Sequence, residues 1–212
     1  MLAYNGGRLR ESCQLVARKF SEKDVTVGMS LAGALTPAGL GPSAIIPLMN
    51  YGFVDWIVAT GANMYHDLHF AFDMSLHQGS PFTDDKELRK DGVIRIYDVV
   101  GDYHDVLMET DRRLRRMLVR HEFQKEMGTQ EFYFYLGKFA DEHEKKNELH
   151  EVSVLAAAYR NGIPVFTSSP GDSTIGMNIA GLEVLNKKKF KLRINPSIDV
   201  SESTAIVLNA KK

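Results

Sequence analysis

Apolar residues recur at helical spacing near the start of the chain. Leu9, Cys13, Val16 and Phe20 are separated by four, three and four positions, which is typical of an amphipathic helix. The pattern predicts a helix that ends before residues 21–24, with Cys13 facing the core. A reactive thiol is the alternative interpretation of Cys13, but catalytic cysteines require an electropositive and accessible environment that this stripe does not indicate.

The pattern then changes to short β-branched runs followed by small-residue turns and apolar helical stretches. This order occurs three times and predicts an α/β fold, a Rossmann-like, mostly parallel sheet flanked by helices. The predicted strands are Val25–Met29, Val54–Ala59 and Pro164–Thr167; the turns are Leu31–Gly39, Thr60–Asn63 and Ser168–Ser173; the helices are Pro42–Tyr51, Met64–Leu76 and Val152–Arg160.

All three turns follow the carboxyl ends of predicted strands. Ligands of open α/β sheets bind at this edge, and the N–H groups at a helix start favour anions such as a pyrophosphate. The turns therefore indicate a nucleotide site. The alternative for each turn alone is purely structural, because small residues also let a helix pack closely against a sheet.

Residues 80–147 have a different texture and predict a mainly helical, charged segment. Its first half is basic, with arginines at 112, 113, 115, 116 and 120, and its second half carries Asp141, Glu142 and Glu144. Solvated helices with ion pairs are the favoured interpretation, and a binding patch for an acidic partner is the alternative. The length of 212 residues fits one domain.

Composition excludes several classes of protein. Lys and Arg total 26 and Asp and Glu total 27, a net charge of −1, so the chain has no cationic surplus for nucleic acid. One cysteine permits no internal disulfide, and no apolar run approaches the ~20 residues of a membrane helix. We therefore expect a cytoplasmic protein that binds neither nucleic acid nor membrane.

Three segments together resemble the deoxyhypusine synthase family, and more closely its bacterial deoxyhypusine synthase-like branch. They are Ser30–Gly39, Val58–Asp67 and Pro164–Gly176, and the resemblance extends to Asp91–Tyr97 and Ile194–Lys211. Each motif alone is weak, but their order and spacing are fairly specific. The resemblance covers nearly the whole chain and implies one NAD-binding domain over residues 1–212, truncated at its C-terminus.

The resemblance implies an NAD-dependent aminobutyl transferase. Such enzymes oxidise a polyamine, usually spermidine, to an imine and pass the aminobutyl group to a lysine and then to an acceptor amine, with NAD carrying the redox step and the lysine the covalent intermediate. A protein lysine and a small diamine both stay open as acceptors. Family members are typically tetramers, so a homo-oligomer is implied as well.

The family motifs also assign cofactor residues to this sequence. Gly33, Ala34, Leu35, Thr36 and Pro37 match the first cofactor turn, and Thr60, Gly61 and Ala62 match the second. Asp172 matches an aspartate that contacts the nucleotide, as acidic side chains at strand ends do in other dinucleotide folds. An Asx-turn or a helix N-cap is the alternative role for Asp172.

Three substrate positions depart from the family pattern. Tyr65, His66 and Met177 stand where the resemblance places acidic residues that hold the cationic polyamine. Tyr65 could instead supply a cation–π face. His66, with an ordinary pKa near ~6.5, could accept a proton during amine oxidation.

The nucleophilic lysine of the family is a second departure. Its Gly-Gly-Gly context should follow shortly after Lys212, while Lys211 and Lys212 end a predicted helix at about residues 199–210. We therefore expect the isolated chain to be inactive, as a fragment, a split subunit that needs a lysine-bearing partner, or an incomplete gene model.

Two other functions are compatible with these residues. The first is a non-catalytic partner subunit that completes interface sites through residues 112–120 and the cofactor turns. The second is a metal-dependent hydrolase that uses His66 and His69, three positions apart on one helical face, with His77 nearby. The family resemblance itself implies no metal.

Overall fold

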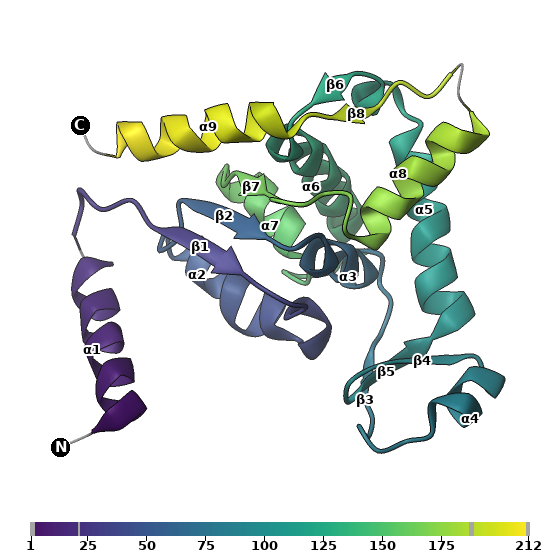
Figure 1. Ribbon diagram of the computed structural model, residues 1–212, viewed down its shortest axis with the longest axis horizontal. Coiled ribbons are helices and arrows are strands. Elements are labelled where there is room, and N and C mark those ends of the chain that lie inside the picture. The colour runs from purple at the N-terminus through teal and green to yellow at the C-terminus, as the bar shows by residue number, and fades with distance from the viewer. Residues whose placement is uncertain (1–2, 21, 187–188, 211–212) are drawn as a thin grey trace.

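A parallel sheet of three strands forms the centre of the molecule, in the order β1–β2–β7 (Figure 1). The strands are β1 (Gly28–Leu31), β2 (Trp56–Ala59) and β7 (Val165–Phe166). Ile57 of β2 lies opposite Met29 on one side and Val165 on the other. This computed structural model describes residues 3–20, 22–186 and 189–210. The predicted α/β fold with a parallel sheet is confirmed.

Helices connect and cover these strands. Those of the core are α2 (Ile46–Asn50), α3 (Gly61–Ala71), α6 (Thr129–Lys146), α7 (Val154–Asn161) and α8 (Thr174–Leu185), with short 3-10 or π-helical turns at Thr36–Ala38, Gly41–Ile45, Tyr103–Met108 and His121–Phe123. α3 begins three residues earlier than predicted because the Thr60 side chain caps it by accepting a hydrogen bond from the N–H of Asn63. The predicted second turn is thus the first turn of a helix.

The core joins the sheet to the helices from the middle of the chain. Ile57, Leu68, Leu114 and Leu136 are each fully buried. They come from β2, α3, α5 (Glu109–Leu118) and α6, so segments far apart in sequence share one apolar interior. The charged segment is therefore part of the core and does not form a separate unit among the described residues.

The N-terminal helix differs from its prediction. α1 (Tyr4–Lys19) forms, but none of its residues is buried and Cys13 is exposed. The expected core position of Cys13 is wrong for this chain, because α1 extends away from the sheet and no other element of the described chain covers its apolar stripe (Figure 1).

Residues 80–147 contain strands that the sequence pattern did not reveal. β4 (Val93–Ile96) and β5 (Val99–Asp102) form an antiparallel hairpin, and β3 (His77–Gln78) pairs with β5. A short helix, α4 (Asp85–Lys90), precedes the hairpin. The arginines of α5 are partly paired within the protein, for example Arg113 with Glu109, which agrees with the favoured interpretation of a packed helix with ion pairs.

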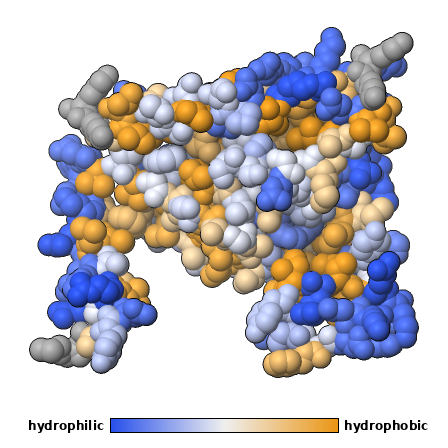
Figure 2. Space-filling model, in the orientation of Figure 1, coloured by the Kyte–Doolittle hydropathy of each residue, from blue (hydrophilic) through white to orange (hydrophobic). Residues whose placement is uncertain are grey.

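The C-terminal segment, which contains β8 and α9, packs beside the charged segment of residues 80–147. β8 (Arg193–Ile194) pairs in parallel with β6 (Glu126–Met127), and α9 (Pro196–Asn209) follows. The predicted terminal helix is therefore confirmed, although Lys211 and Lys212 lie outside the described residues. Apolar side chains stay exposed on α8 and α9, and Figure 2 shows apolar surface along the edge where these helices lie; examples are Leu185, Val200 and Leu208.

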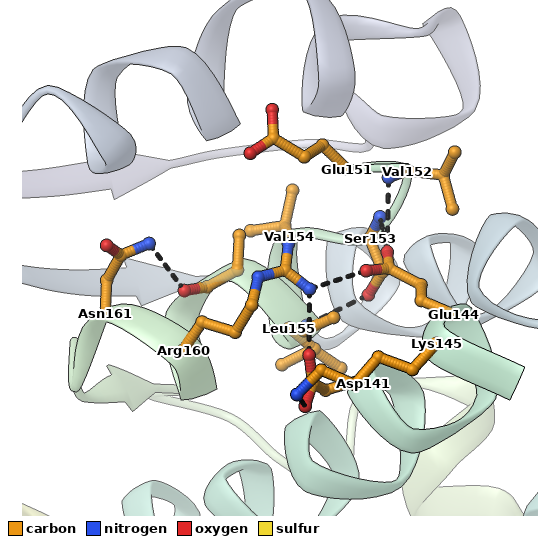
Figure 3. Close-up of polar contacts among 12 residues, drawn as sticks. Asp141, Glu144, Lys145, Glu151, Val152, Ser153, Val154, Leu155, Arg160 and Asn161 are labelled. Atoms are coloured by element: carbon orange, nitrogen blue, oxygen red, sulfur yellow. Dashed lines mark hydrogen bonds and ion pairs between the residues drawn. The ribbon is translucent and has the colours of Figure 1, made fainter. Parts of the chain in front are cut away.

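A buried ion cluster joins α6 to α7 (Figure 3). The Arg160 guanidinium lies 3.0 Å from Asp141 Oδ1 and 2.6 Å from Glu144 Oε2. Both carboxylates are at most 3% exposed, although the sequence pattern had placed them on a solvated face. Glu144 also accepts hydrogen bonds from the N–H groups of Val152 and Ser153, so the cluster fixes the chain that enters α7.

Within the described ranges, no helix is both long and apolar enough to span a bilayer.

Candidate functional site

The three predicted turns meet at one edge of the sheet. The Thr60 hydroxyl donates a hydrogen bond of 2.5 Å to the carbonyl of Gly33 and so ties the second turn to the first. A Cβ atom at Gly61 would collide with the side chain of Ser173, the last residue of the third turn. Because all three parallel strands point to this edge, the turns that follow them form one surface.

The Asn63 side chain stabilises the conformation of the first turn through hydrogen bonds to its backbone. Its side-chain oxygen accepts from the N–H groups of Leu35 (2.7 Å) and Thr36 (3.3 Å), and its side-chain nitrogen donates to the carbonyls of Leu31 (3.2 Å) and Gly33 (3.1 Å). Gly33 has φ of +62° with open space around it, a conformation that disfavours other residues. The Asn63 side chain is fully buried, and the sequence motifs indicated no role for it.

These contacts sort the predicted cofactor residues into two groups. Thr36, Pro37 and Gly61 are buried, and the N–H groups of Leu35 and Thr36 are used by Asn63. These residues therefore shape the turns. The second group is exposed or half-buried and so forms the accessible surface. It consists of Gly33, Ala34, Leu35, Thr60, Ala62 and Asp172.

The start of α3 supplies donors to this surface. The first N–H groups of a helix have no partner within the helix, and Thr60 caps only that of Asn63. Asp172 is not the N-cap of the helix that follows the third turn, which was the alternative role considered for it. The N-cap of α8 is Ser173, whose hydroxyl accepts from the N–H of Gly176 at 3.2 Å, so Asp172 is left as an exposed side chain in the loop between β7 and α8.

One face of α3 stays partly open along its length. Ala62, His66 and Phe70 are half-buried, whereas every other residue of the helix is buried. The three lie four positions apart and so share one face. This face runs from the second turn, past the His66 imidazole, to Phe70.

Phe70 opens onto a cavity of about 400 Å³. The cavity lies between the end of the first turn and the strands β3 and β5, and its lining includes Pro37, Ala38, Phe70, His77 and Asp98. Asp98 is half-buried, and no ion pair to its carboxylate occurs within the described part of the chain. A cavity of mixed polar and apolar lining that contains a carboxylate without an ion-pair partner among the described residues has the chemistry to receive an ammonium group.

The two histidines of α3 contact each other. His66 Nδ1 lies 3.0 Å from His69 Nε2, and His69 Nδ1 lies 2.8 Å from the Thr110 hydroxyl of α5. Burial lowers the pKa of His66 from 6.5 to about 4, and burial together with His66 lowers that of His69 to about 3. The expectation of an ordinary pKa for His66 is therefore wrong, since desolvation penalises the imidazolium.

Tyr65 faces inward and does not offer its ring to solvent. It is 2% exposed, and its hydroxyl donates to Asp111 Oδ1 at 2.9 Å. Burial, followed by the charge of Asp111, raises the Tyr65 pKa well above its usual range. Asn178 donates to the same oxygen at 2.8 Å and accepts from Arg115 at 2.5 Å. The cation–π role considered for Tyr65 therefore lacks an accessible ring face here.

Asp111 and Asn178 are functional candidates that the sequence pattern did not indicate. Asp111 sits in the arginine-rich stretch and was treated as part of a solvated segment, while Asn178 directly follows Met177. A helical projection of residues 109–118 would have placed Asp111 and Leu114 on one side. Met177 itself is 63% exposed on α8.

The histidines do not form a recognisable metal centre. Both nitrogens of His69 are occupied, by His66 and Thr110, and His77 lies on β3. Across residues 3–20, 22–186 and 189–210, no group of three or more His, Cys, Asp or Glu side chains is arranged to hold a metal ion.

Comparisons with known proteins agree with this geometry. The family model described as deoxyhypusine synthase matches residues 1–212. A deoxyhypusine synthase-like protein of Nostoc punctiforme is 51% identical over 99% of this chain and 53% of its own length. A probable deoxyhypusine synthase 2 of Methanosarcina mazei is 35% identical over 96% of this chain and 56% of its own length. The chain thus spans about half the length of these curated relatives.

A solved structure shares the fold. A crystal structure assigned to deoxyhypusine synthase from Entamoeba histolytica superposes with a TM-score of 0.66 at 13% sequence identity, covering 98% of this chain and 70% of that chain. The family match over the full sequence and the similarity to the cyanobacterial relatives agree with the converging turns at the sheet edge: the chain belongs to the deoxyhypusine synthase family.

Proposed function

We propose that this chain forms the NAD-binding part of an aminobutyl transferase that oxidises a polyamine donor. The observation that carries the proposal is the partly open face of α3. It connects the converged turns to the cavity at Phe70, with His66 between them. A dinucleotide at the turns and an amine in the cavity would then have their reacting atoms on either side of one imidazole.

The converged turns are the proposed cofactor site. The fit rests on the open space around Gly33, the N–H groups at the start of α3 that have no partner within the helix and the exposed Asp172 carboxylate, which suits a ribose hydroxyl. Bound NAD would supply the hydride acceptor for the reaction. Thr36, Pro37 and Gly61 support this site by holding the turns, and Gly33, Ala34, Leu35, Thr60 and Ala62 line it.

The cavity beside Phe70 is the proposed site of the amine. Asp98 supplies the counter-ion for an ammonium group, a role that the family gives to acidic residues at the positions of Tyr65, His66 and Met177. Met177 does not line this cavity; it remains a proposed contact for a part of the substrate that extends beyond it, and Tyr65 acts through Asp111. A polyamine such as spermidine or another small amine fits this combination of one carboxylate with apolar and polar walls.

His66 is the proposed proton acceptor. When the carbon beside the amine nitrogen loses a hydride, the nitrogen loses its proton and a C=N bond forms; His66 Nε2 takes that proton. The lowered pKa of about 4 keeps the imidazole neutral at physiological pH, so it is always ready to accept, although it is a weaker base than an ordinary histidine.

A lysine would then receive the aminobutyl group and pass it to an acceptor amine, either a protein lysine or a small diamine. We further propose that the chain acts as a single domain in a cytoplasmic homo-oligomer, a tetramer, or with a lysine-bearing partner subunit. The 212 residues alone, mixed with NAD and spermidine, are expected to give no transfer, and a lysine-bearing partner should restore it. Transfer by the isolated chain would contradict this expectation.

Binding of NAD by glycine variants tests the cofactor site. Gly33 and Gly52 both have positive φ, +62° and +74°, and open space around them, so Gly33→Leu and Gly52→Leu carry similar strain, about 1 kcal/mol each. Gly52 lies before β2, at the other end of the sheet. We expect Gly33→Leu to weaken NAD binding at least tenfold by calorimetry and Gly52→Leu to leave it unchanged. Equal affinities in both variants would exclude the converged turns as the cofactor site.

A further inference from the structure

A buried chain of polar groups lies behind His66. It runs from His66 Nδ1 to His69 Nε2 (3.0 Å), from His69 Nδ1 to the Thr110 hydroxyl (2.8 Å), and from that hydroxyl to Met74 Sδ (3.2 Å). His69 and Thr110 are both fully buried. Among the described residues, the structure gives His66 Nε2 no hydrogen-bond partner, and His66 is the partly exposed end of the chain.

The number of protons on these groups determines which atom donates and which accepts in each of the hydrogen bonds. A neutral imidazole carries one N–H, a threonine carries one O–H, and a thioether can only accept. Because the Thr110 hydroxyl donates its hydrogen bond to Met74 Sδ, its oxygen accepts a hydrogen bond from His69 Nδ1–H. The Nε2 atom of His69 is then unprotonated and accepts from His66 Nδ1–H, which leaves His66 Nε2 unprotonated.

The opposite direction is disfavoured by the same contacts. If Thr110 donated to His69, lone pairs of its oxygen and of Met74 Sδ would face each other at 3.2 Å in a partly buried place, where an unsatisfied contact is costly. Both histidines are also held neutral, because burial lowers their pKa values to about 4 and about 3. Because both imidazoles are neutral, each of them carries a single N–H group.

We propose that His69 and Thr110 are positioning residues that hold His66 as the Nδ1–H tautomer and so keep its Nε2 lone pair available to accept a proton from the substrate. This inference rests on the proposed function for its chemical meaning. The tautomer itself is a property of the protein alone, because Thr110 and Met74 lie behind the imidazole. Its failure can therefore be separated from a failure of the proposed transferase activity.

The test is the tautomer of His66 in the purified chain labelled with ¹⁵N-histidine, read at neutral pH from long-range ¹H–¹⁵N correlations. We expect an unprotonated Nε2 in the wild type and in Thr110→Ser, which keeps the hydroxyl. Thr110→Val has nearly the same shape but no acceptor for His69 Nδ1–H. His69 should then move its proton to Nε2 and donate to His66 Nδ1, which shifts the tautomer ratio of His66 at least tenfold toward Nε2–H.

Met74→Leu is a second variant in which the tautomer of His66 can be measured if Thr110→Val does not fold. Without the sulfur, the Thr110 hydroxyl is free to donate to His69, so the whole chain should reverse and His66 should again become protonated at Nε2. A protonated Nε2 in the wild type, or a ratio unchanged in both Thr110→Val and Met74→Leu, would overturn the inference.

Kinetics of the enzyme assembled with a lysine-bearing partner give the functional readout. We expect Thr110→Val to lower kcat about tenfold with little change in KM, and Thr110→Ser to restore kcat. A wild-type level of kcat in Thr110→Val would contradict the positioning role. If the wild-type assembly shows no transfer at all while the NMR ratios behave as expected, the proposed function fails and the tautomer assignment stands.

Discussion

His66 and Asp67 are neighbours on α3, but they face opposite environments. The Asp67 carboxylate is enclosed and accepts hydrogen bonds from the Ser153 hydroxyl (2.7 Å) and from the N–H groups of Val154 (2.7 Å) and Leu155 (3.0 Å). His66 has one nitrogen engaged by His69 and is half-buried. Both oxygens of Asp67 thus have partners and the residue anchors α7, while His66 keeps one ring nitrogen without a hydrogen-bond partner among the described residues.

The comparison shows that burial alone does not distinguish a structural group from a functional one. Burial raises the Asp67 pKa to about 6 and lowers the His66 pKa to about 4, so both groups resist charging. They differ in whether every polar atom of the side chain has a hydrogen-bond partner within the described part of the chain. That difference can be tested by removing each group in turn.

The largest effect on stability is expected for Asp67→Ala. Removing the carboxylate leaves two N–H groups and one hydroxyl buried without an acceptor, which should lower the free energy of unfolding by about 4 kcal/mol. Urea denaturation measures this loss. Asp67→Asn keeps one acceptor oxygen and should lose less. A loss under 1 kcal/mol in Asp67→Ala would mean that Asp67 does not anchor α7.

Arg160→Met extends the test to the ion cluster beside Asp67. Two buried carboxylates, Asp141 and Glu144, lose their shared cation, so we expect a loss of about 3 kcal/mol in the free energy of unfolding. Lys145→Met is the matched control because Lys145 pairs with the same Asp141 but is 69% exposed; it should cost less than about 1 kcal/mol. Similar losses in both variants would show that burial of the pair is unimportant.

His66→Ala should show the opposite profile. We expect turnover of the assembled enzyme to fall roughly 100-fold, while the free energy of unfolding changes by less than about 1 kcal/mol, because His66 has only one protein hydrogen-bond partner among the described residues. Steady-state kinetics and urea denaturation of one preparation provide both numbers. Unchanged kinetics would remove His66 from the proposed mechanism.

The pH dependence of stability separates the two sides of α3. The lowered histidine pKa values mean that the unfolded chain binds protons that the folded chain does not, so this contribution is lost as pH falls from about 6.5 toward 4. The raised Asp67 pKa acts in the other direction, since its contribution is fully present below about 3.8 and is lost as pH rises through about 6.

Between pH 4 and 6 the two contributions oppose each other. His66→Ala should therefore reduce the loss of stability on acidification by about 2 kcal/mol, whereas Asp67→Asn should make that loss larger. Urea midpoints at pH 4.5 and pH 7 give both differences. A change of the same sign in the two variants would contradict the assignment of opposite contributions.

Asp98→Asn should have the smallest effect. Its carboxylate is the proposed counter-ion for the amine, so the neutral amide should raise KM for a polyamine about tenfold, near 1.4 kcal/mol, with no change in stability. Asp91→Asn is a control on the same segment, because Asp91 is exposed and does not line the cavity. An unchanged KM in Asp98→Asn would exclude the cavity as the amine site.

The sequence predicted the parts of the fold that depend on local pattern. Short β-branched runs followed by small residues gave the three parallel strands, and the predicted terminal helix formed as α9. The hairpin β4–β5 was missed because its strands, Val93–Ile96 and Val99–Asp102, lie within a charged stretch without clear alternation. Cys13 was misplaced because an apolar stripe indicates a face to be covered, not what covers it.

The candidate site was predicted in outline only. The motifs indicated the three turns and His66, but the roles of Asn63, Asp98, Thr110 and Asp111 depend on contacts between residues far apart in the sequence, as in the Leu35–Asn63 hydrogen bond. Likewise, Asp141 and Glu144 look like a solvated acidic run in sequence, because their partner Arg160 comes from the next helix.

Asn63 gives the first turn an unusual dependence on a distant part of the chain. Since the amide hydrogens of Leu35 and Thr36 are held by this side chain, they should exchange with solvent only when α3 itself opens, on the timescale of a helix and not of a loop. A transplant of residues 31–36 into another sheet would accordingly lose its shape unless the asparagine travelled with it.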